Sequence, residues 1–454
     1  MKKNFIILIL VLALIGSLVY IFINKEDNKK SESQETVSTS IEESSKREES
    51  DDEEEAKSMT DEIMNENMRR VMATKLNIRK EPGLDNEPIG TAGMNTVVKL
   101  INKESEDWAL VEVELSNLNR RDEEGTAIFS NSEGEDLYFI KSENLDAEGN
   151  FVSGNQYYMN TQYLTQDDKY EYTDMSNAKN PFNYGLLFYD ENVAKVMETE
   201  IWNNMKDELK DKGYDGVKVV PCARDKIEDM VASGELDAVE CAPSDFVNMN
   251  SEEKQMEAFG KTMNKVTEKS TYSGIIIANK DSGVDRIEDI VGKKIVTCMP
   301  YSDSGNQIQK YYLKNNKDID IVKESGDNLE ENTRYHHDVF FKVALGQADV
   351  GFCGDFILTD PYTRFEKSAK TFNVPMNSKE DLDKLKSNVQ YFELKGINEI
   401  PNNPHALRAE LYEDKKFRNS LKDVVEDTYN TYREDFGLVD AYSEEYDFLN
   451  EIHE

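Results

Sequence analysis

Short apolar runs separated by longer amphipathic segments occupy the chain from about residue 180 onward. Residues 184–188, 217–220 and 236–240 are apolar enough to be buried strands. Between them, residues 193–212 and 227–233 place apolar side chains at the spacing of a helix that packs on one face. Strands that alternate with helices in this way predict a parallel sheet covered by helices.

A second series of the same kind follows the first one. Its expected elements are a strand at 275–277, a helix at 287–291, a strand at 295–298, a helix at 307–314, a strand at 319–321, a helix at 339–345 and a strand at 348–352. After Pro401 and Pro404, helices between 406 and 432 are expected to return the chain to the first series. The pattern therefore predicts an α/β fold with two parallel-sheet lobes and a cleft between them.

The segment 72–165 has a different pattern, in which apolar and polar residues alternate over short stretches. Residues 73–79 and 108–113 alternate as half-buried strands do, and a turn at Glu81-Pro82-Gly83 follows the first of them. The spacing predicts a small all-β domain ahead of the two lobes, and we find no catalytic combination of residues in it.

The N-terminal end combines a basic start with a long apolar run. Lys2 and Lys3 precede residues 5–23, which carry no charge and are long enough to span a bilayer. We expect residues 1–24 to form an uncleaved signal-anchor, a transmembrane helix, and a cleaved export signal is the alternative. Both place the rest of the chain outside the cytoplasm. Residues 25–60, rich in Ser, Glu and Asp, are expected to be a disordered linker.

The charge balance and the cysteines narrow the classes of partner. The 454-residue chain has 91 acidic and 54 basic residues and a formal net charge of −37, so it is not expected to bind nucleic acid. Its four cysteines lack metal-binding spacing and only four histidines occur, so neither a metal site nor a cofactor is expected. The cysteines are predicted to be core residues, with a disulfide left open; they are Cys222, Cys241, Cys298 and Cys353.

Ser302-Asp303-Ser304-Gly305 is the clearest candidate for ligand chemistry. The motif follows the strand expected at 295–298 and precedes an expected helix, so its backbone N–H groups and two hydroxyls can donate to a small oxyanion. The alternative is a structural role as a helix cap, because Ser and Asp are preferred at that position.

Two segments of the second series carry a family resemblance. The run containing YSGIIIANKDSG, IEDIVGKK and SDSG begins at Tyr272, and HHDVFFKVALGQADVGF begins at His336. Over residues 181–454 the chain resembles the substrate-binding proteins of phosphate, phosphite and phosphonate ABC transporters, which are type 2 periplasmic binding proteins. The resemblance implies a bilobed Venus-flytrap domain that closes on a small oxyanion and delivers it to an ABC permease. It implies no cofactor and no catalysis.

The resemblance also defines domain boundaries. The bilobed domain is predicted at 180–454, with lobe one at about 181–273 and 380–454 and lobe two at about 279–372. The β domain is predicted at 70–166. Its order LNIRKEPG…QYYMNTQYL resembles a bacterial SH3-like barrel, with an insertion at 116–151 as a departure. That likeness implies a module that binds peptidoglycan or peptides, and a spacer is the alternative.

Four ligand contacts are implied by the family motif and one by the strand that crosses between the lobes. Ser302, Ser304 and Gly305 match a Ser-Thr-Ser-Gly motif in which Asp303 replaces the usual Thr. An ionised Asp303 would repel a dianion, so it would instead accept a proton, pair with a cationic group or point away as a cap. Tyr272 stands where the family has a cleft tyrosine, and a core or hinge aromatic is the alternative.

Three further residues complete the predicted site. His337 takes the place of the family's cleft histidine, with Asp338 as a helix cap being the structural alternative. Arg224, where the family has an aromatic residue, is expected to start a helix and bind two oxygens of an oxyanion, and pairing with Glu228 is the alternative. Ser244 follows a lobe-one strand, at the sheet edge where ligands bind in α/β proteins.

These assignments predict an extracytoplasmic substrate-binding protein of an ABC importer. The alternative is a membrane-anchored sensor or cell-wall-interacting protein that uses the bilobed domain together with the β domain. An enzyme is not expected, because no nucleophile motif accompanies His337 and Asp338.

Overall fold

The computed structural model describes residues 65–453, apart from residues 85, 117, 123–124 and 133. The signal-anchor expected at 1–24 and the linker expected at 25–60 lie outside the described residues. Within the described part of the chain, no helix is both long and apolar enough to cross a membrane.

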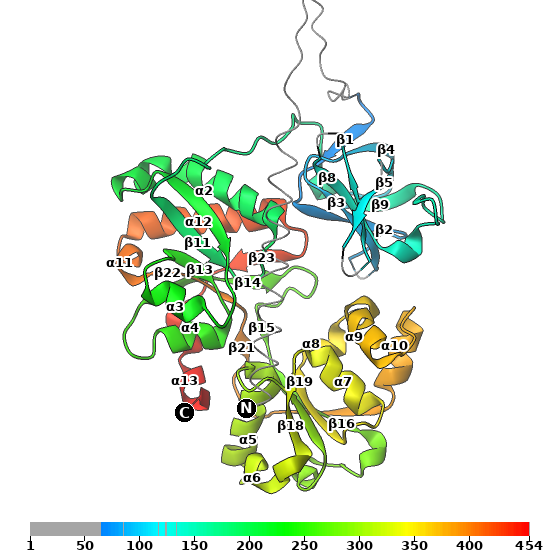
Figure 1. The fold of residues 1–454 in the computed structure, drawn as a ribbon, viewed down its shortest axis with the longest axis vertical. Coiled ribbons are helices and arrows are strands. Elements are labelled where there is room, and N and C mark those ends of the chain that lie inside the picture. The colour runs from blue at the N-terminus through cyan, green and yellow to red at the C-terminus, as the bar shows by residue number, and fades with distance from the viewer. Residues whose placement is uncertain (1–64, 85, 117, 123–124, 133, 454) are drawn as a thin grey trace, which may run out of the picture. The chain divides into compact units, whose positions relative to one another are not determined.

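The N-terminal β domain, residues 65–165, is built on one sheet with the strand order β10-β1-β4-β5-β9-β2-β3-β8-β7-β6 (Figure 1). Its strands are β1 (Met68–Val71), β2 (Lys75–Arg79), β3 (Pro88–Gly93), β4 (Val97–Lys103), β5 (Trp108–Glu112), β6 (Leu118–Arg121), β7 (Ala127–Ser130), β8 (Asp136–Ile140), β9 (Gln156–Asn160) and β10 (Leu164–Thr165). Alternate residues such as Leu76 and Ile78 fill its core. Strands β6 to β8 form within the predicted insertion, so that segment extends the sheet. The SH3-like assignment stays a prediction.

Lobe one is a sheet with the order β12-β11-β13-β22-β14-β23. Its strands are β11 (Pro181–Leu186), β12 (Gly216–Pro221), β13 (Ala238–Glu240), β14 (Met256–Asn264), β22 (Pro404–Arg408) and β23 (Phe436–Val439). β11 is parallel to β12 and β13, whereas β22 is antiparallel to β13 and β14. The prediction of a purely parallel sheet is wrong, because β22 re-enters from lobe two in the opposite direction.

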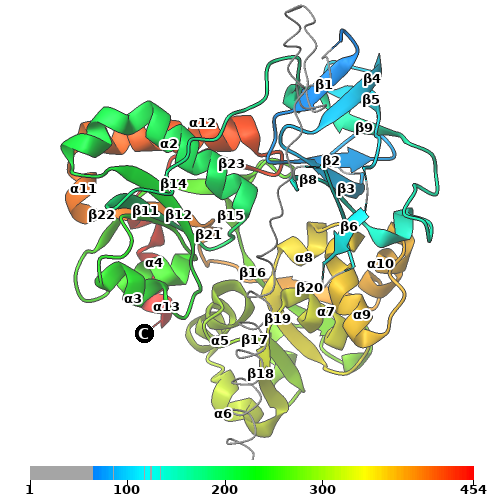
Figure 2. The ribbon, with the colours of Figure 1, turned by 45° about the horizontal axis from the view of Figure 1, so that its top comes forward.

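Helices cover both faces of the lobe-one sheet. α2 (Glu191–Asp211) and α12 (Lys415–Tyr432) lie side by side on one face (Figures 1 and 2). The opposite face carries α3 (Ile227–Ala232), α4 (Pro243–Met249) and α13 (Phe448–His453). Successive residues of β13 serve the two cores in turn, because side chains alternate along a strand: Ala238 packs with α2 and α12, and Val239 with α3 and α4.

Lobe two is a second mixed sheet, with the order β18-β17-β19-β16-β20. Its strands are β16 (Gly274–Asn279), β17 (Ile295–Cys298), β18 (Leu329–Thr333), β19 (Val350–Gly354) and β20 (Val389–Glu393). Its helices are α5 (Ile308–Lys317), α6 (Ile321–Ser325), α7 (His336–Ala344), α8 (Phe356–Thr359), α9 (Glu366–Phe372) and α10 (Lys379–Lys386). β17 is parallel to β18 and β19, and β16 is antiparallel to β19 and β20.

Two predictions for lobe two are wrong. The strand expected at 319–321 is absent from the described structure, because the Asp320 carboxylate accepts the N–H of Lys323 and starts helix α6 there. The prediction that the chain returns to lobe one at about residue 380 is wrong, because β20 pairs with β16 and therefore belongs to lobe two. The chain passes between the lobes at two paired strands, β15 (Thr271–Tyr272) and β21 (Ile400–Pro401).

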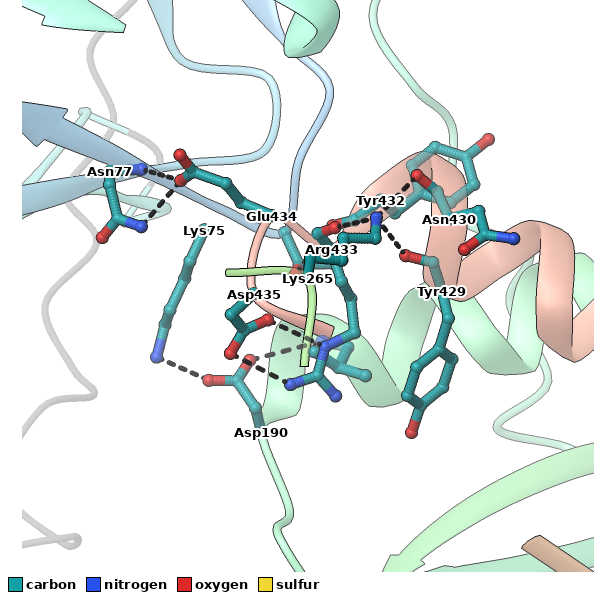
Figure 3. Close-up of polar contacts among 12 residues, drawn as sticks. Lys75, Asn77, Asp190, Lys265, Tyr429, Asn430, Tyr432, Arg433, Glu434 and Asp435 are labelled. Atoms are coloured by element: carbon teal, nitrogen blue, oxygen red, sulfur yellow. Dashed lines mark hydrogen bonds and ion pairs between the residues drawn. The ribbon is translucent and has the colours of Figure 1, made fainter. Parts of the chain in front are cut away.

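Polar contacts join the β domain to lobe one, at the segment that follows α12 and at the residue that caps α2 (Figure 3). Oε2 of Glu434 accepts the backbone N–H of Asn77 and its side-chain amide, both at 2.7 Å. The ammonium of Lys75 lies 2.5 Å from Asp190, which caps α2. Burial raises the pKa of Glu434. These contacts fix strand β2 of the β domain on lobe one.

Candidate functional site

The loop that carries the Ser302–Gly305 motif connects β17 to α5, and buried side-chain amides hold its backbone in place. After β17 the chain forms one π-helical turn at Asp303–Gln307, which continues as α5. The side-chain amide of Asn306 donates to Thr297 Oγ1 at 2.7 Å and to the Cys298 carbonyl at 3.1 Å. The amide of Gln309 donates to the Ser304 carbonyl at 2.6 Å. The apolar strand therefore leads into a loop whose backbone is fixed by buried amides.

Gly305 is required at its position by packing and not by backbone conformation. A Cβ atom there would lie 2.6 Å from Cys298 Sγ and 2.8 Å from His336 Cε1, closer than real contacts allow. The absence of a side chain lets the loop approach the end of β17 and the first turn of α7. Glycine in the motif thus brings the loop and His336 together.

The Asp303 carboxylate makes a polar contact between the two lobes. Its Oδ2 accepts the backbone N–H of Ser244 at 3.2 Å, and its Oδ1 lies 2.9 Å from Nε2 of His453. Ser244 belongs to α4 and His453 to α13, so both partners come from lobe one. Only 5% of Asp303 is exposed to solvent. A carboxylate of lobe two is thus held by lobe-one groups in a buried position.

Arg224 lies beside this contact, in the turn that precedes α3 and not at the start of the helix. Its guanidinium binds both carboxylate oxygens of Asp245 at 2.8 to 3.1 Å and donates to Ser244 Oγ at 2.6 Å. The expected alternative partner, Glu228, is not its partner. Burial raises the pKa of Asp245, although the bonds from Arg224 oppose the rise. The guanidinium also lies over the exposed ring of Tyr301, 4.9 Å from its centroid.

Tyr272 lies in β15, where the chain crosses into lobe two. Burial raises the pKa of its hydroxyl, and the charge of Asp303 raises it further. The hydroxyl is therefore neutral at physiological pH and able to donate a hydrogen bond.

The two adjacent histidines of α7 have different surroundings. His337 Nε2 lies 3.0 Å from Asp360 Oδ2, and its ring packs edge-on against Phe365 inside lobe two. His336 faces Gly305 instead and accepts the N–H of Gly354 at its Nδ1. Burial lowers the pKa of His336 to about 4, so it is neutral.

The structure brings most of the predicted site residues together, at the ends of β12, β13 and β17. Ser244 contacts Asp303 directly, and Arg224 lies next to it through its bonds to Ser244 and Asp245. Ser302, Ser304 and Gly305 share the loop of Asp303. His337 is outside this cluster, and a cavity of about 690 Å³ also lies elsewhere, between the β domain and lobe two. Sequence reasoning missed His336, Asp245 and His453, although the HHD motif and the loop after β13 contained the first two.

Two mixed α/β lobes joined by a pair of crossing strands, with polar groups of both lobes meeting between them, define a two-lobed ligand-binding protein. The chain belongs to the family of periplasmic substrate-binding proteins of phosphonate ABC transporters, whose model matches residues 189–433.

Solved structures with a similar arrangement share little sequence with this chain. A binding protein of a phosphonate ABC transporter from Pseudomonas aeruginosa is 18% identical, over 60% of this chain and 85% of that one, with a TM-score of 0.36. PhnD1 from Prochlorococcus marinus, in complex with methylphosphonate, is 14% identical over 60% and 97%, with a TM-score of 0.40. A Xanthomonas citri protein bound to ATP is 12% identical over 60% and 96%, with a TM-score of 0.44. No curated protein matches the chain.

Proposed function

We propose that this protein captures a small oxyanion, namely a phosphonate, phosphate or phosphite, between its lobes and delivers it to an ABC permease. The supporting observation is the way in which Asp303 is held. Its carboxylate receives a backbone N–H from Ser244 and faces the imidazole of His453. An oxyanion presents the same kind of acceptor oxygens, so donors that hold a carboxylate here are suited to hold an oxyanion.

Each neighbouring group has a role in this proposal. Arg224 positions Ser244 by binding its hydroxyl and the adjacent Asp245, which fixes the donor N–H. Ser302 and Ser304 belong to the same lobe-two loop as Asp303, and their hydroxyls are proposed to donate to the bound ligand. In the cell, residues 1–24 would tether the protein to the membrane, with the bilobed domain on the extracytoplasmic side.

We expect a phosphorus oxyanion to raise the thermal stability of the protein. A ligand at a hundredfold excess over its Kd stabilises the folded state by about 2.7 kcal/mol. Thermal denaturation would be followed with methylphosphonate, aminoethylphosphonate, phosphate, phosphite and sulfate, and Kd values would be obtained by calorimetry. Ser304→Ala is expected to weaken binding about tenfold or more, because a hydrogen bond to a charged group contributes roughly 1.5–3 kcal/mol. Arg224→Ala is also expected to weaken binding about tenfold, because Ser244 and Asp245 lose the guanidinium that holds the donor N–H in place.

Arg364→Ala is the matched control for these variants. Its side chain is 56% exposed on lobe two, away from the Asp303 contact, so its loss should leave Kd unchanged. No stabilisation by any phosphorus oxyanion would refute the proposed ligand. Stabilisation that survives both Arg224→Ala and Ser304→Ala would refute the proposed site.

A further inference from the structure

We propose that Asp303 is a built-in competitor of the ligand and a latch between the lobes. Its carboxylate occupies the Ser244 N–H and faces His453, so an external oxyanion reaches these lobe-one groups only when Asp303 leaves them. The inference rests on the proposed function for the identity of the competing ligand. The latch itself rests only on the contacts between the lobes.

The contact connects groups that are carried by two different sheets. Asp303 follows β17 and is carried by the lobe-two sheet, whereas Ser244 and His453 are carried by helices packed on the lobe-one sheet. The covalent links between the lobes are the crossing strands β15 and β21. A hinge motion at these strands would therefore have to break the contacts of Asp303 with Ser244 and His453.

The lobe-one side of the latch is itself rigid. Ser244 is 3% exposed, and its hydroxyl accepts a hydrogen bond from Arg224, which is paired with Asp245. α13 places His453 next to α4, where Phe246 packs edge-on against Tyr446 at 5.2 Å. Both partners of Asp303 are thus held in place by their own lobe, so the carboxylate binds to groups that are already positioned.

Charge gives the latch a consequence for specificity. Asp245 is a buried carboxylate paired with the Arg224 guanidinium, and Asp303 is a second buried carboxylate close enough for its charge to act on Asp245. A dianion that entered beside them would meet repulsion from Asp303 as well as competition for its donors. Replacement of Asp303 by a short neutral residue should remove both obstacles. We therefore expect Asp303→Ser to strengthen methylphosphonate binding at least tenfold.

The distance between the lobes tests the latch without any ligand. The four native cysteines are buried, so spin labels can be attached at Lys254→Cys on lobe one and Lys323→Cys on lobe two, both exposed positions. Pulsed electron paramagnetic resonance would compare the full-length protein with Asp303→Ser and with His453→Ala. We expect both variants to shift the distance distribution to longer values. Asp338→Asn, which removes the same charge from lobe two, should leave the distribution unchanged.

The two measurements separate the latch from the proposed function. Longer distances without binding of any phosphorus oxyanion would support the latch and refute the ligand assignment. Unchanged distances in both variants would overturn the latch, even if Asp303→Ser binds methylphosphonate more tightly, since Asp303 would then act by repulsion alone. If Asp303→Ser fails to fold, as judged by circular dichroism, His453→Ala decides the distance test.

Discussion

Glu434→Ala is expected to lower the free energy of unfolding by roughly 3–5 kcal/mol, because it breaks a buried ion pair from one side. Glu434 is 4% exposed and lies 3.7 Å from the guanidinium of Arg79, which is buried to the same degree. The same carboxylate accepts both amides of Asn77. Its removal would leave a buried guanidinium without this carboxylate and a backbone N–H of strand β2 without its acceptor.

The loss of stability caused by Glu434→Ala should be greatest where the β domain contacts lobe one. Urea denaturation would give the change in stability, and hydrogen exchange should show faster exchange at the Asn77 amide. Asp423→Ala, an exposed carboxylate on α12, serves as the control and should change stability by less than about 0.5 kcal/mol. Glu434→Gln keeps an acceptor for Asn77 and should cost less than Glu434→Ala. Equal stability of Glu434→Ala and Asp423→Ala would show that the contact does not secure the β domain.

The elements that could be predicted from the sequence are those whose pattern is local. The helix expected at 193–212 forms at Glu191–Asp211, because its apolar spacing and the capping residue Asp190 act within a few residues. Strand β20 was placed in the wrong lobe because its partner, β16, is more than a hundred residues earlier in the chain. Periodicity identifies a strand but does not identify the strand with which it pairs.

The candidate site divides along the same line. The loop at Ser302–Gly305 could be predicted, because a strand, a short polar loop and a helix follow one another directly. His453 could not, since it lies 150 positions from Asp303 and nothing near it in the sequence indicates that contact. His336 and His337 show that the sequence could locate the helix turn but not the histidine that faces the loop. Adjacent helical residues point about 100° apart, and the packing of α7 decides which of them faces the loop.

Acidification is expected to unfold the protein through its buried histidines. His405 lies in β22 with its Nδ1 2.6 Å from the hydroxyl of Tyr184 and its ring edge-on to Tyr429. Burial, together with the nearby positive charge of Arg433, lowers the pKa of His405 from 6.5 to about 3. The pKa of His336 falls to about 4. Below pH 6.5 these histidines are therefore protonated in the unfolded chain but stay neutral in the folded protein. Their contribution to the free energy of unfolding is fully present above pH 6.5 and is lost as the pH falls.

The size of the effect follows from proton linkage. Each of these histidines should cost up to about 1.4 kcal/mol for every pH unit between 6.5 and its folded-state pKa. Glu240 acts in the opposite direction, because burial raises its pKa and its protonation favours the folded state. His405→Gln, which keeps a polar group for Tyr184, isolates the histidine contribution. Between pH 6.5 and 4.5, wild type should lose about 2 kcal/mol more than His405→Gln in urea denaturation. Parallel pH profiles would rule out a neutral, buried His405.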